Sequence, residues 1–235
     1  MKTKIVAFLP CRKGSQRVIN KNTRTFAGIN GGLTSIKINQ LIKSKLIDKI
    51  IVSTDDKLVK EISEDLLQDS NKEYEILDRP AFLATSEATT DSVIEYVGEI
   101  IKEHCYVMWT HVTSPFIDEE TYDRAIKEFF ERKQFGFDSM MSVTELKKFI
   151  WNSNGPINYK PEEIKWPQTQ NISPLFEVNS GFFLSEVSTY KELRNRIGTK
   201  PLLYPLDTVT SLDIDWEEDF NISQAIWNQK QKGEF

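Results

Sequence analysis

A cluster of basic and small polar residues follows the first apolar run of the chain. The stretch RKGSQRVINKN, residues 12–22, is separated by one residue, Cys11, from KIVAFLP, residues 4–10. Lysine and arginine side chains bind phosphate oxygens, and the backbone N–H groups of a turn that contains glycine can do the same. The spacing matches neither GxxxxGK[ST] nor GxGxxG, two common phosphate-binding loops. The residues therefore indicate either a binding loop for a small anion or a solvated basic turn.

A pair of carboxylates lies near the other end of the chain. Asp213 and Asp215 are two residues apart in SLDIDWEED. In an extended backbone both side chains point to the same side. Two adjacent carboxylates suit Mg²⁺, whose coordination substrate phosphates can complete. The alternative is an acidic flank to the final helix. Together, the basic loop and this pair suggest Mg²⁺-dependent nucleotide chemistry.

Two further polar groups follow predicted strands. Residues 53–56, STDD, are best explained as a helix cap, because acidic residues suit the start of a helix. Residues 111–115, HVTSP, place an imidazole and two hydroxyls where they would either contact a polar ligand or cap a turn. No nucleophile elbow accompanies His111, so the sequence does not support a Ser-His-Asp hydrolase.

The elements that must position these groups alternate along the chain. Apolar runs predict strands, and one-sided apolar periodicity predicts helices. The predicted strands cover residues 4–10, 49–56, 74–78 and 105–112, and the helices cover 31–48, 56–68, 89–104 and 118–133. Such alternation predicts an α/β fold with a doubly wound, mainly parallel sheet and helices on both faces. Ligands bind beyond the carboxyl ends of such strands. Most of the polar groups described above come directly after a predicted strand and would therefore lie at this edge.

The second half of the chain does not continue the regular alternation of predicted strands and helices. Residues 147–180 show no clear periodicity and hold four of the nine prolines and two of the five tryptophans. A segment of this kind is uncommon in a compact domain unless it is functional or contacts a partner. Strands are predicted over 137–146, 181–185 and 201–206, followed by a helix within 211–229. We therefore expect one domain, residues 1–235, with a protruding subregion.

Composition narrows the class of protein. The net charge is −5, which disfavours nucleic-acid binding. No apolar run is long enough to span a membrane. Cys11 and Cys105 lie in apolar surroundings without CxxC spacing, so we expect buried, reduced thiols and no zinc site. These features predict a soluble, cytoplasmic protein.

Six segments, in order, resemble those of the acylneuraminate cytidylyltransferase family, also called CMP-sialic acid synthetases. The resemblance extends from about residue 4 to 227. The family's patterns are RxGSKGxxxKN, a similar second strand, RPxxLAxD, QPTSP, NGaxY and DIDTxxDL. The matching segments here are RKGSQRVINKN, IIVSTDD, RPAFLATSEATT, HVTSP, EVNSGFF and DIDWEEDF.

The resemblance implies a Rossmann-like nucleotidyltransferase fold of the glycosyltransferase-A-like type. It implies transfer of CMP from CTP to a nonulosonic, sialic-acid-like keto-sugar acid, with release of pyrophosphate, in the synthesis of surface glycan precursors. Mg²⁺ would be the cofactor. Family members are usually homodimers, and residues 145–178 would form the protruding segment for dimerisation and the acceptor site.

Roles for individual residues follow from matched positions. The nucleotide-binding residues would be Arg12, Ser15, Lys21, Asn22, Arg79, Ala88 and Thr90. The acceptor-binding residues would be His111, Thr113, Ser114, Gln168, Gln170, Asn179 and Phe182. Asp213 and Asp215 would hold Mg²⁺. Arg12, Lys21 and Asp215 would be the catalytic residues.

The departures from the family pattern lie mainly on the acceptor side. His111 replaces Gln, Ile117 and Gln168 each replace Arg, Ser180 interrupts the Asn-Gly pair, and Phe182 or Phe183 replaces Tyr. In the basic loop, Gln16-Arg17 replaces Lys-Gly. We therefore expect CTP to be kept and the acceptor to differ from ordinary N-acetylneuraminate. The alternatives are a nucleotidyltransferase for another base, a sugar phosphate, a phosphate or a phosphonate, and a non-catalytic nucleotide-binding protein.

Overall fold

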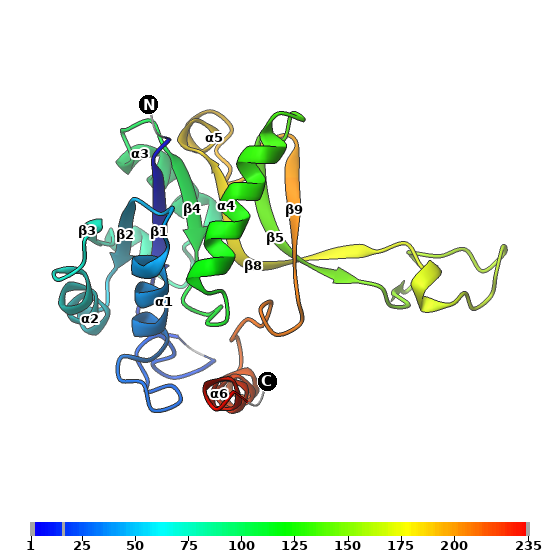
Figure 1. Ribbon diagram of the computed structural model, residues 1–235, viewed down its shortest axis with the longest axis horizontal. Coiled ribbons are helices and arrows are strands. Elements are labelled where there is room, and N and C mark those ends of the chain that lie inside the picture. Colours follow the sequence, from blue (N-terminus) through cyan, green and yellow to red (C-terminus); the bar gives the residue numbers. More distant parts are fainter. Residues whose placement is uncertain (1–2, 16, 234–235) are drawn as a thin grey trace.

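A seven-stranded sheet forms the centre of the computed structural model, which describes residues 3–15 and 17–233 (Figure 1). The spatial order is β3-β2-β1-β4-β8-β5-β9. The strands are β1 (Ile5–Cys11), β2 (Lys49–Thr54), β3 (Glu73–Asp78), β4 (Tyr106–Thr110), β5 (Ser139–Leu146), β8 (Leu175–Glu186) and β9 (Pro201–Leu206). β8 runs antiparallel to its neighbours β4 and β5, and the other pairings in the sheet are parallel. The expected mainly parallel α/β sheet is confirmed.

Helices cover both faces of the sheet because alternate strand residues point to opposite sides. Ile5, Ala7 and Leu9 of β1 belong to one core, whereas Val6 and Phe8 belong to the other. The first core is completed by α1 (Gly32–Lys43), α2 (Lys57–Leu67), α4 (Glu119–Lys133) and α6 (Glu217–Gln231). The second is completed by α3 (Thr90–Ile100) and α5 (Val187–Glu192). Both faces are therefore buried, as a mainly parallel sheet requires.

Helix starts follow the expected capping chemistry. The Asp56 carboxylate accepts from the Leu58 N–H at 3.0 Å and begins α2. The Thr89 hydroxyl accepts from the Ser92 N–H at 3.2 Å and begins α3. α1 ends at Lys43, earlier than residue 48, because the backbone at Ser44 leaves the helical conformation. The sequence therefore predicted the starts better than the ends.

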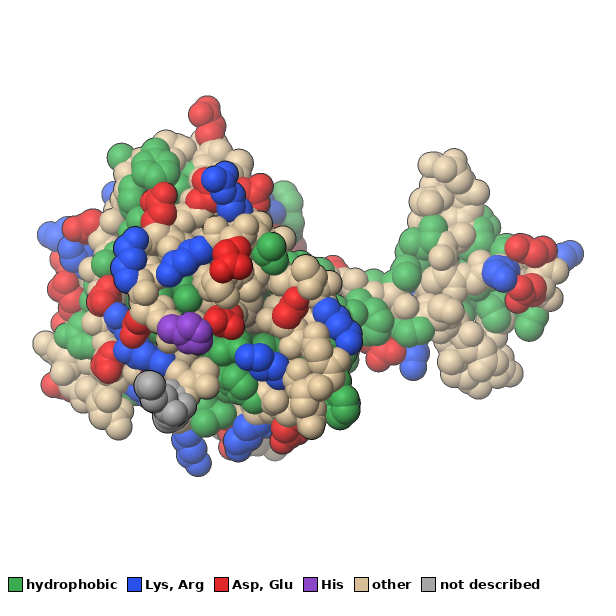
Figure 2. Space-filling model, turned by 90° about the horizontal axis from the view of Figure 1, so that it is seen from above, with side chains coloured by type: hydrophobic (Ala, Val, Ile, Leu, Met, Phe, Trp, Pro, Cys, Tyr) green, Lys and Arg blue, Asp and Glu red, His purple; other side chains and the backbone are tan. Residues whose placement is uncertain are grey.

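Residues 147–174, here called the arm, project away from the body of the molecule (Figures 1 and 2). At its base, β5 and β8 remain paired from Val143–Val178 to Leu146–Leu175. The arm carries β6 (Trp151–Asn152), β7 (Gly155–Pro156) and the 3₁₀ helix η2 (Thr169–Asn171). Four aromatic rings gather on it, from Phe149, Trp151, Tyr159 and Trp166. Trp166 is nevertheless 69% exposed, so the arm leaves apolar surface uncovered.

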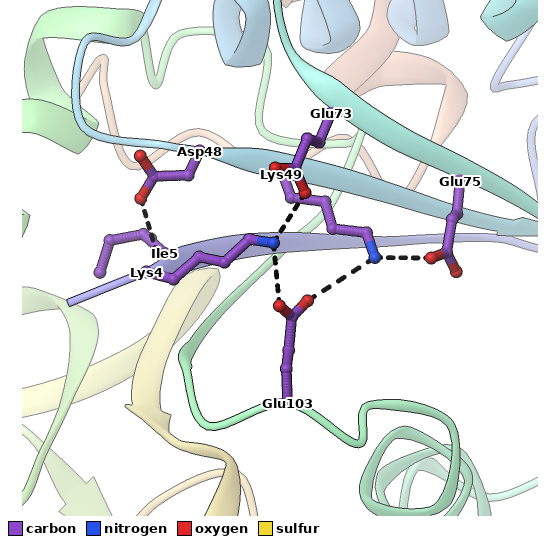
Figure 3. A network of polar contacts seen from close by, with 7 residues as sticks. All are labelled: Lys4, Ile5, Asp48, Lys49, Glu73, Glu75 and Glu103. Carbon is purple, nitrogen blue, oxygen red and sulfur yellow. Dashed lines mark hydrogen bonds and ion pairs between the residues drawn. The ribbon is translucent and has the colours of Figure 1, made fainter. Parts of the chain in front are cut away.

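Charged side chains tie the strands together at the amino end of the sheet (Figure 3). The Lys4 ammonium contacts Glu73 at 2.7 Å and Glu103 at 2.8 Å. The Lys49 ammonium contacts Glu75 at 2.5 Å and Glu103 at 3.6 Å. These hydrogen bonds raise the pKa of Lys4 and lower that of Glu103. The network links β1, β2 and β3 to the loop after α3.

Within residues 3–15 and 17–233, no helix combines the length and the apolar character that crossing a membrane requires. Cys11 lies at the end of β1, and Cys105 lies one residue before β4 rather than within it. Both thiols are buried and unpaired, as expected. Burial raises the pKa of Cys11 to about 12, so this thiol is unreactive.

Candidate functional site

Loops from three strands converge on a cavity of about 240 Å³ at the carboxyl end of the sheet. The basic loop follows β1, the RP segment follows β3, and residues 111–117, here called the β4 turn, follow β4. The lining includes Arg12, Arg79, Ala88, Thr90, Trp109 and His111. We call this cavity the arginine pocket. It brings together four residues that the resemblance assigned to nucleotide binding.

Within the part of the chain that the structure describes, neither arginine of this pocket has a carboxylate hydrogen-bond partner. The Arg12 guanidinium donates to the Thr85 carbonyl oxygen across the pocket. The Arg79 backbone N–H donates to Thr54 at 2.9 Å, while its side-chain Nε is buried without a hydrogen-bond partner. Burial lowers the pKa of Arg79, and the nearby charge of Asp55 partly offsets that effect. Partly desolvated cations that lack a bonded anion form a good binding site for a phosphate-bearing ligand.

His111 has a defined protonation state. The Trp109 indole N–H donates to His111 Nε2 at 3.0 Å, so the imidazole proton must sit on Nδ1. Burial, together with the positive charges of Arg196, Lys37 and Lys21, lowers the pKa of His111 to about 3. His111 is therefore a neutral hydrogen-bond donor near neutral pH, and its Nε2 lone pair is occupied by the Trp109 N–H.

The basic loop reaches the carboxylate pair. The Lys21 ammonium donates to the Ile214 carbonyl at 2.6 Å and lies 3.5 Å from Asp215 Oδ1. The Arg17 guanidinium donates to the same Asp215 oxygen at 2.9 Å. The Asn22 amide donates to the Arg12 carbonyl at 3.1 Å, which links both ends of the loop. Residues nearly 200 positions apart in sequence thus form one charged site.

A second cavity, of about 500 Å³, adjoins the carboxylates. Its lining includes Asp213, Asp215, Asn179, Ser180, Thr144 and Ser211, and we call it the carboxylate pocket. Glu177 also lines it, and none of its lining residues, all of which the structure describes, is basic. The pocket is therefore polar and acidic, in contrast to the arginine pocket.

The carboxylate pair fits a divalent cation. Asp213 Oδ1 is buried and has no hydrogen-bond partner among the described residues, and burial, with the nearby charge of Asp215, raises the pKa of Asp213. A bound cation would satisfy that oxygen. In the described part of the chain, no cluster of three or more acidic, histidine or cysteine side chains forms a metal site. Mg²⁺ would therefore take its remaining ligands from water and substrate, as it commonly does.

The other predicted site residues have varied positions. Ser15 is half-buried in the basic loop, and Gln16 lies outside the described residues. The Thr113 hydroxyl hydrogen-bonds Asp213, and Ser114 Oγ is buried without a partner. Thr113 therefore contacts the carboxylate pair, whereas Ser114 lies in the interior of the protein.

Five predicted acceptor residues line neither pocket, namely Thr113, Ser114, Gln168, Gln170 and Phe182. Phe182 is fully buried against Tyr122 and Tyr204, because the alternation of β8 turns it into the core. Gln168 and Gln170 are exposed on the arm, where Gln170 donates to Gln168 at 2.7 Å. A ligand held between the pockets would meet Asn179 from β8, but not Phe182.

Sequence reasoning missed several residues of this site. The pairing of Trp109 with His111 was detectable, since residues i and i+2 of a strand share a face. Asp55 was assigned only to a cap, although its carboxylate accepts from the Lys13 N–H at 2.8 Å in the basic loop. Ser180 has φ 56°, a conformation that favours glycine, at the site of the interrupted Asn-Gly pair.

Comparison with known proteins agrees with this geometry. A family model described as Cytidylyltransferase matches residues 6–218. An N-acylneuraminate cytidylyltransferase of Escherichia coli O18:K1:H7 is 27% identical, over 99% of this chain and 54% of that protein. A CMP-N,N'-diacetyllegionaminic acid synthase of Legionella pneumophila is 26% identical, over 97% of this chain and 98% of that protein. This chain therefore spans about half the length of the E. coli relative.

The fold has solved counterparts as well. The structure of CMP:2-keto-3-deoxy-manno-octonic acid synthetase complexed with CTP has a TM-score of 0.63 to this chain at 14% identity. That similarity covers 97% of this chain and 100% of the other. The family match includes the basic loop, both pockets and the carboxylate pair. The chain belongs to the cytidylyltransferase family.

Proposed function

We propose that this protein transfers CMP from CTP to a nonulosonic, sialic-acid-like keto-sugar acid and releases pyrophosphate. The observation that carries this proposal is Lys21, which joins the basic loop to the carboxylate pair. Phosphate-binding cations thereby lie beside a site suited to Mg²⁺. Family membership and the names of the E. coli and Legionella relatives support the reaction class and the acceptor class.

The nucleotide would occupy the arginine pocket. Arg79, Ala88 and Thr90 would surround the cytidine, while Arg12, Ser15, Lys21 and Asn22 would hold the triphosphate. Attack on the α-phosphorus develops negative charge on the phosphoryl oxygens and on the departing pyrophosphate. Fixed cations that already point at that region stabilise the charge without reorganisation.

Asp213 and Asp215 would hold Mg²⁺. When bound, the ion supplies additional charge neutralisation at the phosphates. The chain's own residues would align the acceptor hydroxyl with the α-phosphorus, which is where most of the rate gain from positioning arises. No covalent protein nucleophile is needed for this direct transfer.

The acceptor would extend toward the carboxylate pocket. Asn179, Ser180 and Ser211 offer amide and hydroxyl groups that suit the hydroxyl-rich side chain of a keto-sugar acid. The neutral His111 would donate through Nδ1 to an acceptor oxygen.

We further propose a homodimer whose arms pack against the partner copy and bring Gln168 and Gln170 to its acceptor site. The exposed Trp151, Ile164 and Trp166 support this assembly, because isolated apolar surface of this kind favours contact with protein. The unpaired, buried Cys11 and Cys105 suit a reducing compartment such as the cytoplasm.

The test is an assay of purified protein with Mg²⁺, each of the four common nucleoside triphosphates and a panel of acceptors. We expect pyrophosphate release with CTP and a keto-sugar acid, and thermal stabilisation by CTP above UTP, GTP and ATP. Stabilisation by CTP without turnover on any keto-sugar acid would remove the acceptor class. Equal responses to all four nucleotides would remove the cytidylyltransferase assignment itself.

A further inference from the structure

A lysine lies fully buried beneath the β4 turn. Lys37 of α1 is 0% exposed, and its ammonium donates to the Ser114 carbonyl at 2.9 Å, the Ile117 carbonyl at 3.1 Å and the Tyr122 hydroxyl at 2.9 Å. None of these three partners is a carboxylate. Lysine is almost never fully buried without an ionic partner, because burial removes its hydration. Converging N–H donors, three of them when the amine is protonated, are what this residue provides that an apolar side chain of the same size would not.

A second α1 side chain holds the same turn. The Gln40 amide donates to the Pro115 carbonyl at 2.6 Å, and Gln40 lies three residues after Lys37, on the same side of the helix. The carbonyls of residues 114, 115 and 117 therefore all accept hydrogen bonds from side chains of α1. Buried backbone carbonyls need hydrogen-bond donors. Because α1 supplies the donors for three carbonyls of the β4 turn, these contacts fix the orientation of the turn.

The contacts continue from the turn into the sheet. The Tyr122 hydroxyl lies 2.6 Å from Thr110 Oγ1. The Thr110 hydroxyl in turn donates to the Gly181 carbonyl at 2.9 Å. The Thr113 carbonyl accepts from the Ile214 N–H at 2.9 Å, directly between the two carboxylates. Lys37 thus contacts the turn that contains His111 and that is hydrogen-bonded to the segment carrying the two carboxylates.

The same helix holds the basic loop at its other end. The Thr34 N–H and hydroxyl both donate to the Asn22 carbonyl at 2.9 Å. α1 therefore contacts the triphosphate side through Thr34 and the acceptor side through Lys37 and Gln40. The two contacts are separable, because different residues make them.

We propose that Lys37 is the positioning residue of the β4 turn, which it orients so that His111 and Thr113 face the acceptor. This inference rests on the proposed function. Position 117, where the resemblance would place an arginine, holds Ile117, whose carbonyl receives the Lys37 cation from inside the protein. Lys37 touches no substrate in this arrangement and acts through the turn.

The kinetic test uses Lys37→Met, which keeps the length of the side chain and removes its donors. We expect KM for the keto-sugar acid to rise about tenfold, while KM for CTP changes less than about twofold. Lys43→Met is the matched control, since Lys43 is exposed on the same helix. The proposal is wrong if a folded Lys37→Met protein has an unchanged acceptor KM, or if both variants raise it equally.

A second readout does not depend on turnover. The chain has two histidines, so imidazole NMR signals from His111 can be assigned against those of His104. In the wild type we expect His111 to stay neutral, with its proton on Nδ1, from about pH 8 to pH 5. In Lys37→Met, loss of the fixed tautomer of His111 is expected. An unchanged tautomer would contradict the positioning role.

Gln40→Leu separates position from charge, because it loosens the β4 turn without changing any charge near His111. Besides Lys37, the cations that act on His111 are Arg196 and Lys21, and neither is altered. We expect a rise in acceptor KM of about threefold and partial loss of the tautomer. If Lys37→Met does not fold, this variant decides, and no change in either readout overturns the proposal. If the wild type uses no keto-sugar acid, the proposed function fails while the NMR result still tests Lys37.

Discussion

The two ends of the same sheet differ in how completely their charged groups are paired. At the amino end, Lys4 and Lys49 each contact two carboxylates, and the cluster is internally paired (Figure 3). At the carboxyl end, Arg17 and Lys21 contact Asp215, but Arg79 Nε and Asp213 Oδ1 are buried and have no hydrogen-bond partner among the described residues. Leaving a buried polar atom unsatisfied costs roughly 1–3 kcal/mol. The paired charges hold strands together, and the unpaired ones mark where a ligand completes the structure.

The largest expected effect is at Asp213. We expect Asp213→Asn to lower kcat about a thousandfold, because the metal site loses one of its two carboxylates. Its melting temperature should stay the same or rise, since a desolvated carboxylate is removed. Pyrophosphate release and thermal unfolding measure the two outcomes. Glu218→Gln, an exposed acid nearby, is the control. A destabilised but active variant would place Asp213 among the structural charges.

The pH dependence of the unfolding free energy tests whether Lys37, buried beneath the site, also lacks a compensating charge. Burial lowers the pKa of Lys37 to about 7, with Asp118 partly opposing the shift. Between pH 7 and about pH 10, the unfolded chain therefore binds a proton that the folded protein has lost, so stability rises with pH. Relative to Lys37→Met, we expect the wild type to gain about 2–3 kcal/mol of unfolding free energy from pH 7 to pH 9.

Urea denaturation at both pH values measures this gain, and Lys43→Met, which keeps Lys37, should show the same gain as the wild type. A difference between the wild type and Lys37→Met that does not vary with pH would mean that Lys37 keeps its proton in the folded protein. Lys37 would then resemble the satisfied lysines of the amino end.

Neighbouring residues of the basic loop sharpen the comparison further. Arg12 lines the arginine pocket, whereas Lys13 is exposed. We expect Arg12→Ala to raise KM for CTP about tenfold and Lys13→Ala to change it by less than about twofold. CTP-dependent initial rates measure both. Equal, mild effects would return the loop to being a solvated basic turn.

The smallest effect is expected at the amino end. Glu103→Gln weakens contacts with Lys4 and Lys49, which are partly exposed, so the loss of unfolding free energy should be about 1 kcal/mol or less. Urea denaturation measures it. Kinetic constants should be unchanged, and any effect on KM would show that the two ends of the sheet are coupled.

Features that depend on local sequence were predictable. Strand alternation, the caps at Asp56 and Thr89, and the loops after strands follow from near neighbours in the chain, and the structure confirms them. The resemblance assigned Arg12 and Arg79 to one nucleotide site, and the structure brings them together because the parallel strands β1 and β3 end at the same edge of the sheet.

Features that depend on which strands lie side by side were not predictable. The buried position of Phe182 and the role of Lys37 arise from pairings between distant segments. Periodicity placed Phe182 in a strand but could not show which of its faces would be buried. Likewise, a lysine among the apolar residues of a helix reads as a surface residue until the turn beneath it is known.

The position of β8 has a consequence for the assembly of the chain. β8 lies between β4 and β5, although it is synthesised after both. Until residue 186 has left the ribosome, β5 lacks the neighbour that joins it to the rest of the sheet, and β4 presents an open edge. Pairings over such sequence distances are slow to form. We therefore expect the insertion of β8 to be the late, rate-limiting event of folding, which closes the middle of the sheet last.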